Sequence, residues 1–91
     1  MELECSVKIS NKYGLHARAS TRLAEVAKRF QSSIRLSRVG ANEDVDAKSI
    51  LGILTLGAEK GQTLRIRASG EDAKQAVDAL LEVVRQNFGE E

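Results

Sequence analysis

The chain has 91 residues and nearly balanced charge, with 14 Lys or Arg against 13 Asp or Glu, and 42% of its residues are hydrophobic. These values fit one domain over residues 1–91 and argue against a nucleic-acid binder, which needs a basic surface. No apolar run approaches the roughly 18 residues of a membrane span and no signal peptide is evident, which predicts a cytoplasmic protein. One Cys and one His cannot build a usual zinc site, so we expect neither metal nor cofactor.

The first half of the chain predicts a strand, a helix and a hairpin. Residues 2–9 alternate polar and apolar, as a half-buried strand does, and Cys5 is expected to face the core as a small hydrophobe. Residues 10–14 form a polar break, and residues 17–30 then predict a helix with one buried stripe. The stripe consists of Ala19, Leu23, Val26, Ala27 and Phe30. Residues around 34–39 and 45–47 predict two strands joined by a turn at 40–43.

The second half predicts a short helix, a strand and a long helix. Ser49 stands where an N-cap would stand, directly before the apolar residues 50–56. Residues 63–68 alternate as a fourth strand. Residues 69–72 then open a helix with acidic residues in its first turn, which we expect to run to Phe88, followed by a frayed tail at 89–91. The element order is β, α, β, β, α, β, α, which predicts an α+β fold with one sheet covered by helices.

The segment between the first strand and the first helix carries the chemistry. His16, the only histidine, lies beside the free N–H groups of a helix start, which suit an anion and phosphate above all. Arg18 adds a forked cation that matches phosphate oxygens. Imidazole is a competent nucleophile near neutral pH, because its ordinary pKa of about 6.5 leaves much of it uncharged. The segment therefore predicts a histidine that carries a phosphoryl group, although a lone histidine at a helix start is more often a surface or capping residue.

Two segments support the first interpretation. Residues 13–18, Tyr-Gly-Leu-His-Ala-Arg, resemble the phosphorylation-site motif of the HPr family, the histidine-containing phosphocarriers of the bacterial sugar phosphotransferase system. Residues 48–57 resemble the regulatory serine segment of that family. The two segments occur in the family's order and at close to its usual separation. Chain length and element order also agree, so the resemblance covers essentially the whole chain.

The resemblance implies a fold and a function. The fold is an open-faced β-sandwich in which three helices pack on one face of a four-stranded antiparallel sheet. His16 would accept a phosphoryl group from phospho-enzyme I, originally from phosphoenolpyruvate, and pass it to enzyme IIA domains. Nδ1 is the ring nitrogen that the family uses. The protein would then be a carrier and a substrate of its partners rather than an enzyme, and we expect a monomer.

The resemblance also assigns roles to other residues. Arg18 would stabilise the phosphate, and the backbone N–H groups of Ala17 and Arg18 are candidates for phosphate contact. Gly14 is expected to supply a backbone angle beside the site. Ser49 would be phosphorylated by an HPr kinase/phosphorylase, besides capping its helix. The two remaining assignments are on the short helix, where Leu51 and Leu54 match exposed docking positions while Ile50 and Ile53 point inward.

One position departs from the family pattern, and two alternatives stay open. The family usually has proline where this chain has Ala19, which leaves the helix intact but bears on the rigidity of the loop. The nearest alternative function is a carrier of the same fold in a nitrogen-related or purely regulatory phosphorelay, without sugar transport. The other is a non-catalytic α/β interaction module in which His16 is incidental.

Overall fold

Alternating apolar side chains on four segments build one antiparallel sheet. The computed structural model describes residues 1–90 and has strands β1 (Glu2–Lys8), β2 (Ser33–Arg38), β3 (Asp44–Asp46) and β4 (Thr63–Ser69). Their order across the sheet is β1-β4-β2-β3, so β1 and β3 are the edges. On central β4 the inward side chains are almost completely buried, whereas those on edge β1 are only half-buried. Cys5 is therefore half-buried rather than a core residue.

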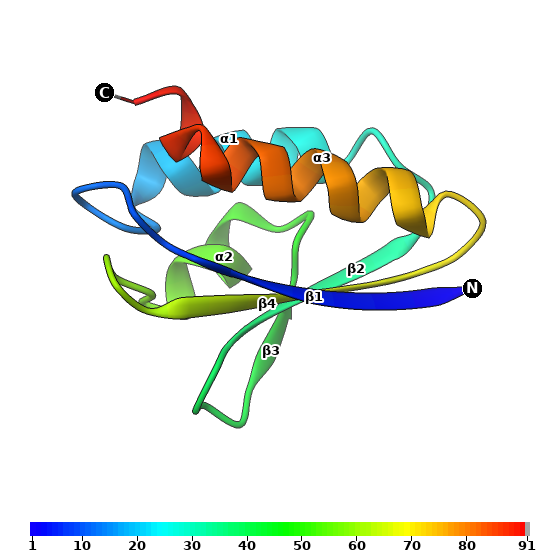
Figure 1. Ribbon diagram of the computed structural model, residues 1–91, viewed down its shortest axis with the longest axis horizontal. Helices are drawn as coiled ribbons and strands as arrows, with labels where there is room; N and C mark the ends of the chain where they lie inside the picture. The colour runs from blue at the N-terminus through cyan, green and yellow to red at the C-terminus, as the bar shows by residue number, and fades with distance from the viewer. Residues whose placement is uncertain (91) are drawn as a thin grey trace.

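Three helices complete the core on one face of this sheet. They are α1 (Ala17–Ala27), α2 (Ile50–Thr55) and α3 (Ala73–Arg85). Figure 1 shows α1 and α3 side by side above the sheet, with α2 beneath α1. The expected α+β fold, with an open four-stranded antiparallel sheet and three helices, is confirmed. Among the described residues, no helix is both long enough and apolar enough to cross a membrane.

The end of α1 and the hairpin differ slightly from the prediction. The helix ends at Ala27, because the next turn bonds to carbonyls three residues back, so Phe30 packs half-buried after the helix rather than within it. The ammonium group of Lys48 donates to the carbonyl of Phe30 at 2.8 Å, which caps this end. Strand β3 ends at Asp46, and Ala47 is buried just beyond it.

The start of α3 is anchored in a way that the sequence did not indicate. We expected acidic residues in the first turn, but the helix begins at Ala73, after them. The carboxylate of Asp72 instead accepts hydrogen bonds from the backbone N–H groups of Gln31 and Ser32, at 2.9 Å each, and from the Ser32 hydroxyl. The Ser32 hydroxyl and then the Gln31 N–H hold the pKa of Asp72 below its usual value. These bonds tie α3 to the turn before β2.

The C-terminal segment folds back over the molecule. Helix α3 ends at Arg85, not at Phe88, and a 3-10 turn, η1 (Asn87–Gly89), follows. Asn87 and Phe88 have positive φ angles of 54° and 58°, which reverses the chain and buries the Phe88 ring. The prediction of a frayed tail is thus wrong for Gly89 and Glu90, and its last residue, Glu91, lies outside the described residues.

Candidate functional site

His16 is the N-cap of α1, and its imidazole does the capping. The backbone is extended there, and the His16 carbonyl accepts the N–H of Ser20 at 2.8 Å. Nδ1 of the ring accepts the N–H of Arg18 at 3.2 Å. A backbone N–H can only donate, so this bond assigns the lone pair to Nδ1 and the proton of the neutral ring to Nε2. The ring nitrogen beside the start of α1 is thus the one that holds the lone pair.

The loop before His16 is held in place on both sides. Gly14 has a φ of +63°, and a Cβ there would lie 2.5 Å from the carbonyl oxygen of Ala58. That oxygen accepts the N–H of Leu15 at 3.0 Å, and the Ser20 hydroxyl donates to the Leu15 carbonyl at 3.2 Å. Only glycine combines this left-handed backbone with so close an approach. The expected role of Gly14 is therefore confirmed.

The far side of the His16 ring meets the C-terminal segment. Oε2 of Glu90 lies 2.6 Å from Nε2, and both side chains are mostly buried, with exposed fractions of 28% for His16 and 17% for Glu90. The two atoms are close, but their geometry is not that of an aligned hydrogen bond. The other carboxylate oxygen, Oε1, accepts the side-chain amide of Asn11 at 3.1 Å. Tyr13 adds an edge-on ring, 5.9 Å from the imidazole between centroids.

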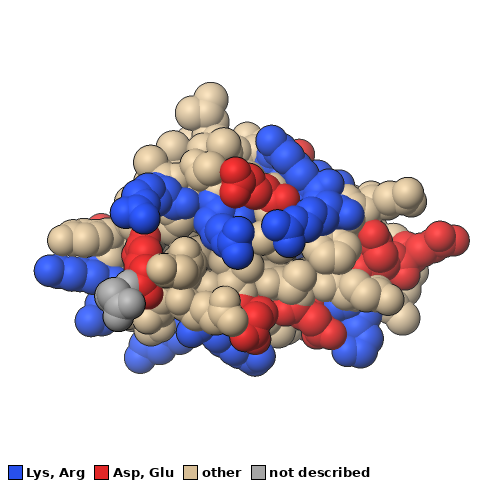
Figure 2. Space-filling view, turned by 90° about the horizontal axis from the view of Figure 1, so that it is seen from above, with Lys and Arg blue, Asp and Glu red and all other residues tan. Residues whose placement is uncertain are grey.

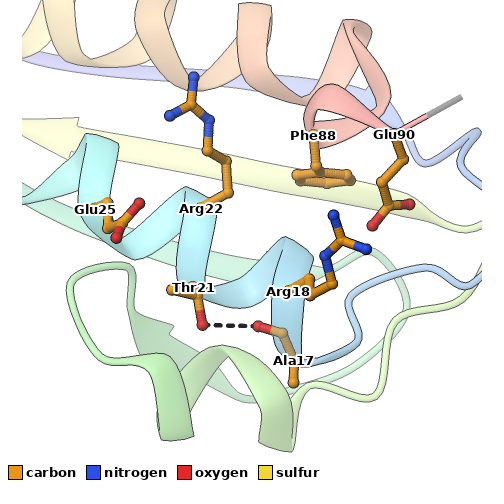
Figure 3. A pocket seen from close by; sticks show the side chains of 7 residues that line it. All are labelled: Ala17, Arg18, Thr21, Arg22, Glu25, Phe88 and Glu90. Atoms are coloured by element: carbon orange, nitrogen blue, oxygen red, sulfur yellow. Dashed lines mark hydrogen bonds between the residues drawn. The ribbon is translucent and has the colours of Figure 1, made fainter.

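Two neighbouring hollows open at this site. One, of about 420 Å³, lies at His16 and is lined by Lys12, Tyr13, His16, Arg18 and Glu90. The second, of about 380 Å³, lies between α1 and the C-terminal turn. Figure 3 shows Arg18 and Arg22 reaching into it from α1 and Phe88 and Glu90 facing them. Within residues 1–90, no carboxylate lies within ion-pairing distance of either guanidinium group. Arg18 is therefore available to an anion at His16.

The outer face of the helical layer is mostly basic along α1. Figure 2 shows Lys and Arg side chains over this face, with acidic side chains between them. The exposed basic residues of α1 and the turn after it are Arg18, Arg22, Lys28 and Arg29. In the same stretch Glu25 is the exposed acidic residue. An acidic partner surface would be attracted here, although the whole chain has a net charge of only +1.

The second predicted segment has the expected local structure. Ser49 is the N-cap of α2, and its hydroxyl accepts the N–H of Gly52 at 3.0 Å. Ile53 is fully buried and Ile50 is half-buried, both against the core. Leu51 is 75% exposed and Leu54 is half-buried. The outward direction of Leu51 is thus confirmed, and Leu54 is partly covered.

Two residues at the site escaped the sequence analysis. Asn11 lies in a polar break with no periodicity, and Glu90 was assigned to a frayed tail. The residues before Glu90 did carry a signal, because an Asn and a Gly flanking an apolar residue after a helix are typical of a left-handed chain reversal. Nothing in the sequence indicated Asn11. Over the described residues, no cluster of three or more His, Cys, Asp or Glu side chains could hold a metal ion.

Comparison with known proteins gives consistent results. The family model "PTS HPr component phosphorylation site" matches residues 3–86. The phosphocarrier protein HPr of Cupriavidus necator is 44% identical over 88 residues, which cover 97% of each chain. The crystal structure of HPr-C-His from Thermoanaerobacter tengcongensis superposes with a TM-score of 0.91 at 38% identity, covering 98% of each chain. An HPr dimer from the same organism has a TM-score of 0.76 at 38% identity, covering 92% of this chain and 94% of that one.

Proposed function

The chain belongs to the HPr family of phosphocarrier proteins of the phosphotransferase system, and we propose that Nδ1 of His16 carries its phosphoryl group. The group comes from phospho-enzyme I and passes to enzyme IIA domains. The observation that carries this proposal is the bond from the Arg18 N–H to Nδ1, which leaves the nucleophilic lone pair at the N-terminus of an 11-residue helix. Helix dipole and free N–H groups favour an anion there.

The transfer uses few groups of this chain. The lone pair of Nδ1 forms the new N–P bond while the bond between phosphorus and enzyme I breaks, and its electron pair stays with enzyme I. Once Nδ1 is bonded to phosphorus, it no longer accepts the Arg18 N–H, which then donates to a phosphoryl oxygen together with the N–H of Ala17. The Arg18 guanidinium neutralises charge on the same oxygens. Positioning and charge stabilisation are most of what phosphoryl transfer needs.

Partners would dock on the surface around His16. The exposed Leu51 and the partly covered Leu54 supply an apolar patch on α2, and the basic residues of α1 attract an acidic surface. We propose enzyme I and enzyme IIA domains as the proteins that use it. The chain performs no turnover by itself, since it is modified by one partner and restored by the next, and it would act in the cytoplasm as a monomer.

Ser49 is the proposed regulatory site, modified by an HPr kinase/phosphorylase. Ser49 is half-buried at the N-cap of α2, so a phosphate there remains next to the backbone N–H of Gly52 that the hydroxyl now engages. That location tolerates negative charge, so the fold should persist. The phosphate adds about −1.5 to −2 charges directly beside Leu51, which a docking partner would have to desolvate.

Labelling from phosphoenolpyruvate tests the proposal. The purified chain is incubated with radiolabelled phosphoenolpyruvate and catalytic enzyme I, alongside His16→Ala and Arg18→Ala. We expect stoichiometric, acid-labile and base-stable label on the wild type, none on His16→Ala, and slow labelling of Arg18→Ala. Full labelling of His16→Ala, or no labelling of the wild type by an active enzyme I, would contradict the proposal.

A further inference from the structure

Asn11 is a buried polar residue that no part of the transfer chemistry has used. Only 2% of its surface is exposed. Its side-chain amide donates two hydrogen bonds, to the carbonyl of Gly14 at 2.8 Å and to Oε1 of Glu90 at 3.1 Å. The backbone carbonyl of Asn11 accepts the N–H of Gly14 at 3.3 Å. Asn11 therefore joins the loop that carries His16 to the C-terminal segment.

The orientation of the Asn11 amide is fixed by its partners. A backbone carbonyl and a carboxylate oxygen are both acceptors, so the NH₂ group and not the oxygen must face them. The amide oxygen, Oδ1, is left buried without a partner among the described residues. A buried unpartnered acceptor is destabilising. An apolar residue would avoid that penalty, which indicates that the two donated bonds are what this position requires.

Glu90 connects Asn11 to the reactive ring. Its carboxylate has two oxygens, of which one accepts from Asn11 and the other lies 2.6 Å from Nε2 of His16. The path of the chain that brings Glu90 there is specific. Two consecutive non-glycine residues, Asn87 and Phe88, adopt the left-handed backbone.

We propose that Asn11 is a positioning residue for phosphoryl transfer, which holds the Glu90 carboxylate against Nε2 of His16. This inference rests on the proposed function and adds a residue to it. The negative charge of the carboxylate beside Nε2 favours the ring proton on that nitrogen, so the lone pair remains on Nδ1. When Nδ1 attacks phosphorus, the ring gains positive charge, and the carboxylate beside the Nε2 proton stabilises it. The same division of labour operates where a buried carboxylate orients a catalytic histidine.

The test measures the tautomer of His16 separately from its labelling. The variants are Asn11→Ala, the isosteric Asn11→Asp, Glu90→Gln and the double variant Asn11→Ala/Glu90→Gln. Glutamine has one acceptor oxygen, so it can serve Asn11 or Nε2 but not both. Imidazole ¹⁵N signals report which nitrogen holds the proton in the neutral ring, in the absence of any partner. Initial labelling rates with limiting phospho-enzyme I report the transfer.

We expect Asn11→Ala to raise the fraction of rings protonated on Nδ1 and to slow labelling by about threefold to tenfold, the effect of losing one hydrogen bond of ordinary strength. Asn11→Asp should be slower still, because it places a second carboxylate against Glu90. In the Glu90→Gln background, Asn11→Ala should have little further effect, since Asn11 acts through Glu90.

Ser10→Ala is the matched control. It removes the 2.7 Å bond from the Ser10 hydroxyl to Asn87, in the same C-terminal turn, but leaves the bond between Asn11 and Glu90, so its ¹⁵N signals should match the wild type. Unchanged ¹⁵N signals in a folded Asn11→Ala, or losses in rate that add in the double variant, would overturn the proposal. If the wild type itself is not labelled, the proposed function fails, while the ¹⁵N signals still decide whether Asn11 positions Glu90.

Discussion

Replacing Gly14 with alanine tests how the loop before His16 is built. The left-handed backbone costs an L-residue about 1–2 kcal/mol. The added Cβ would also lie 2.5 Å from the Ala58 oxygen and 2.8 Å from Cα of Glu59, so the loop must move and weaken the bond from Leu15 to Ala58, worth about 1 kcal/mol. We expect Gly14→Ala to lower the free energy of unfolding by about 2–3 kcal/mol.

A second glycine separates the two contributions. Gly57 has nearly the same φ, +60°, but nothing lies within 4 Å of the Cβ that alanine would add. Gly57→Ala should therefore lose only the backbone contribution, about 1–2 kcal/mol. Urea unfolding of both variants and the wild type measures the difference, and each kcal/mol should lower the melting temperature by about 4–8 °C. Equal losses at the two positions would refute the argument that close packing against Ala58 makes glycine necessary at 14.

Three further predictions concern stability and docking. Hydrogen bonds lower the pKa of Asp72 in the folded state. Its contribution to the free energy of unfolding should therefore be complete above the pKa of the unfolded chain and disappear as pH falls through the pKa of the folded protein. The urea midpoints of wild type and Asp72→Asn should differ at pH 7 and converge in acid. Ala19→Pro should keep the fold and raise the free energy of unfolding by about 0.4–1 kcal/mol, because a proline compatible with a first helical turn restricts the unfolded chain. Thermal unfolding measures the change. A large loss would show a loop path that proline cannot follow. Ser49→Asp should keep its circular dichroism spectrum but be labelled more slowly by phospho-enzyme I than the wild type, and the Ser49-phosphorylated protein should be slower still. Equal labelling rates in these three proteins would leave Ser49 as a helix cap only.

Local patterns predicted the fold and half of the site. The alternation in the strands, the apolar stripes of the helices and the Ser49 cap each depend on residues close together in the sequence, and each is present. The bond between His16 and the Arg18 N–H spans two residues, and the sequence already placed His16 at the helix start. Where the prediction was wrong, at the start of α3 and at the tail, the decisive partners lie far away. Asp72 is 41 positions from Gln31, and Glu90 is 79 positions from Asn11.

The two nitrogens of His16 are therefore controlled by different parts of the chain. Nδ1 is held by the start of its own helix, two residues away, while Nε2 is held by a carboxylate from the C-terminal turn. On the proposed function, phosphorylation at Nδ1 would replace the first contact and leave the second in place, so the ring would keep its orientation while it carries the group. A carrier that reacts with a donor and an acceptor in turn would be served by this arrangement, because the contact at Nε2 lies on the side of the ring that does not react.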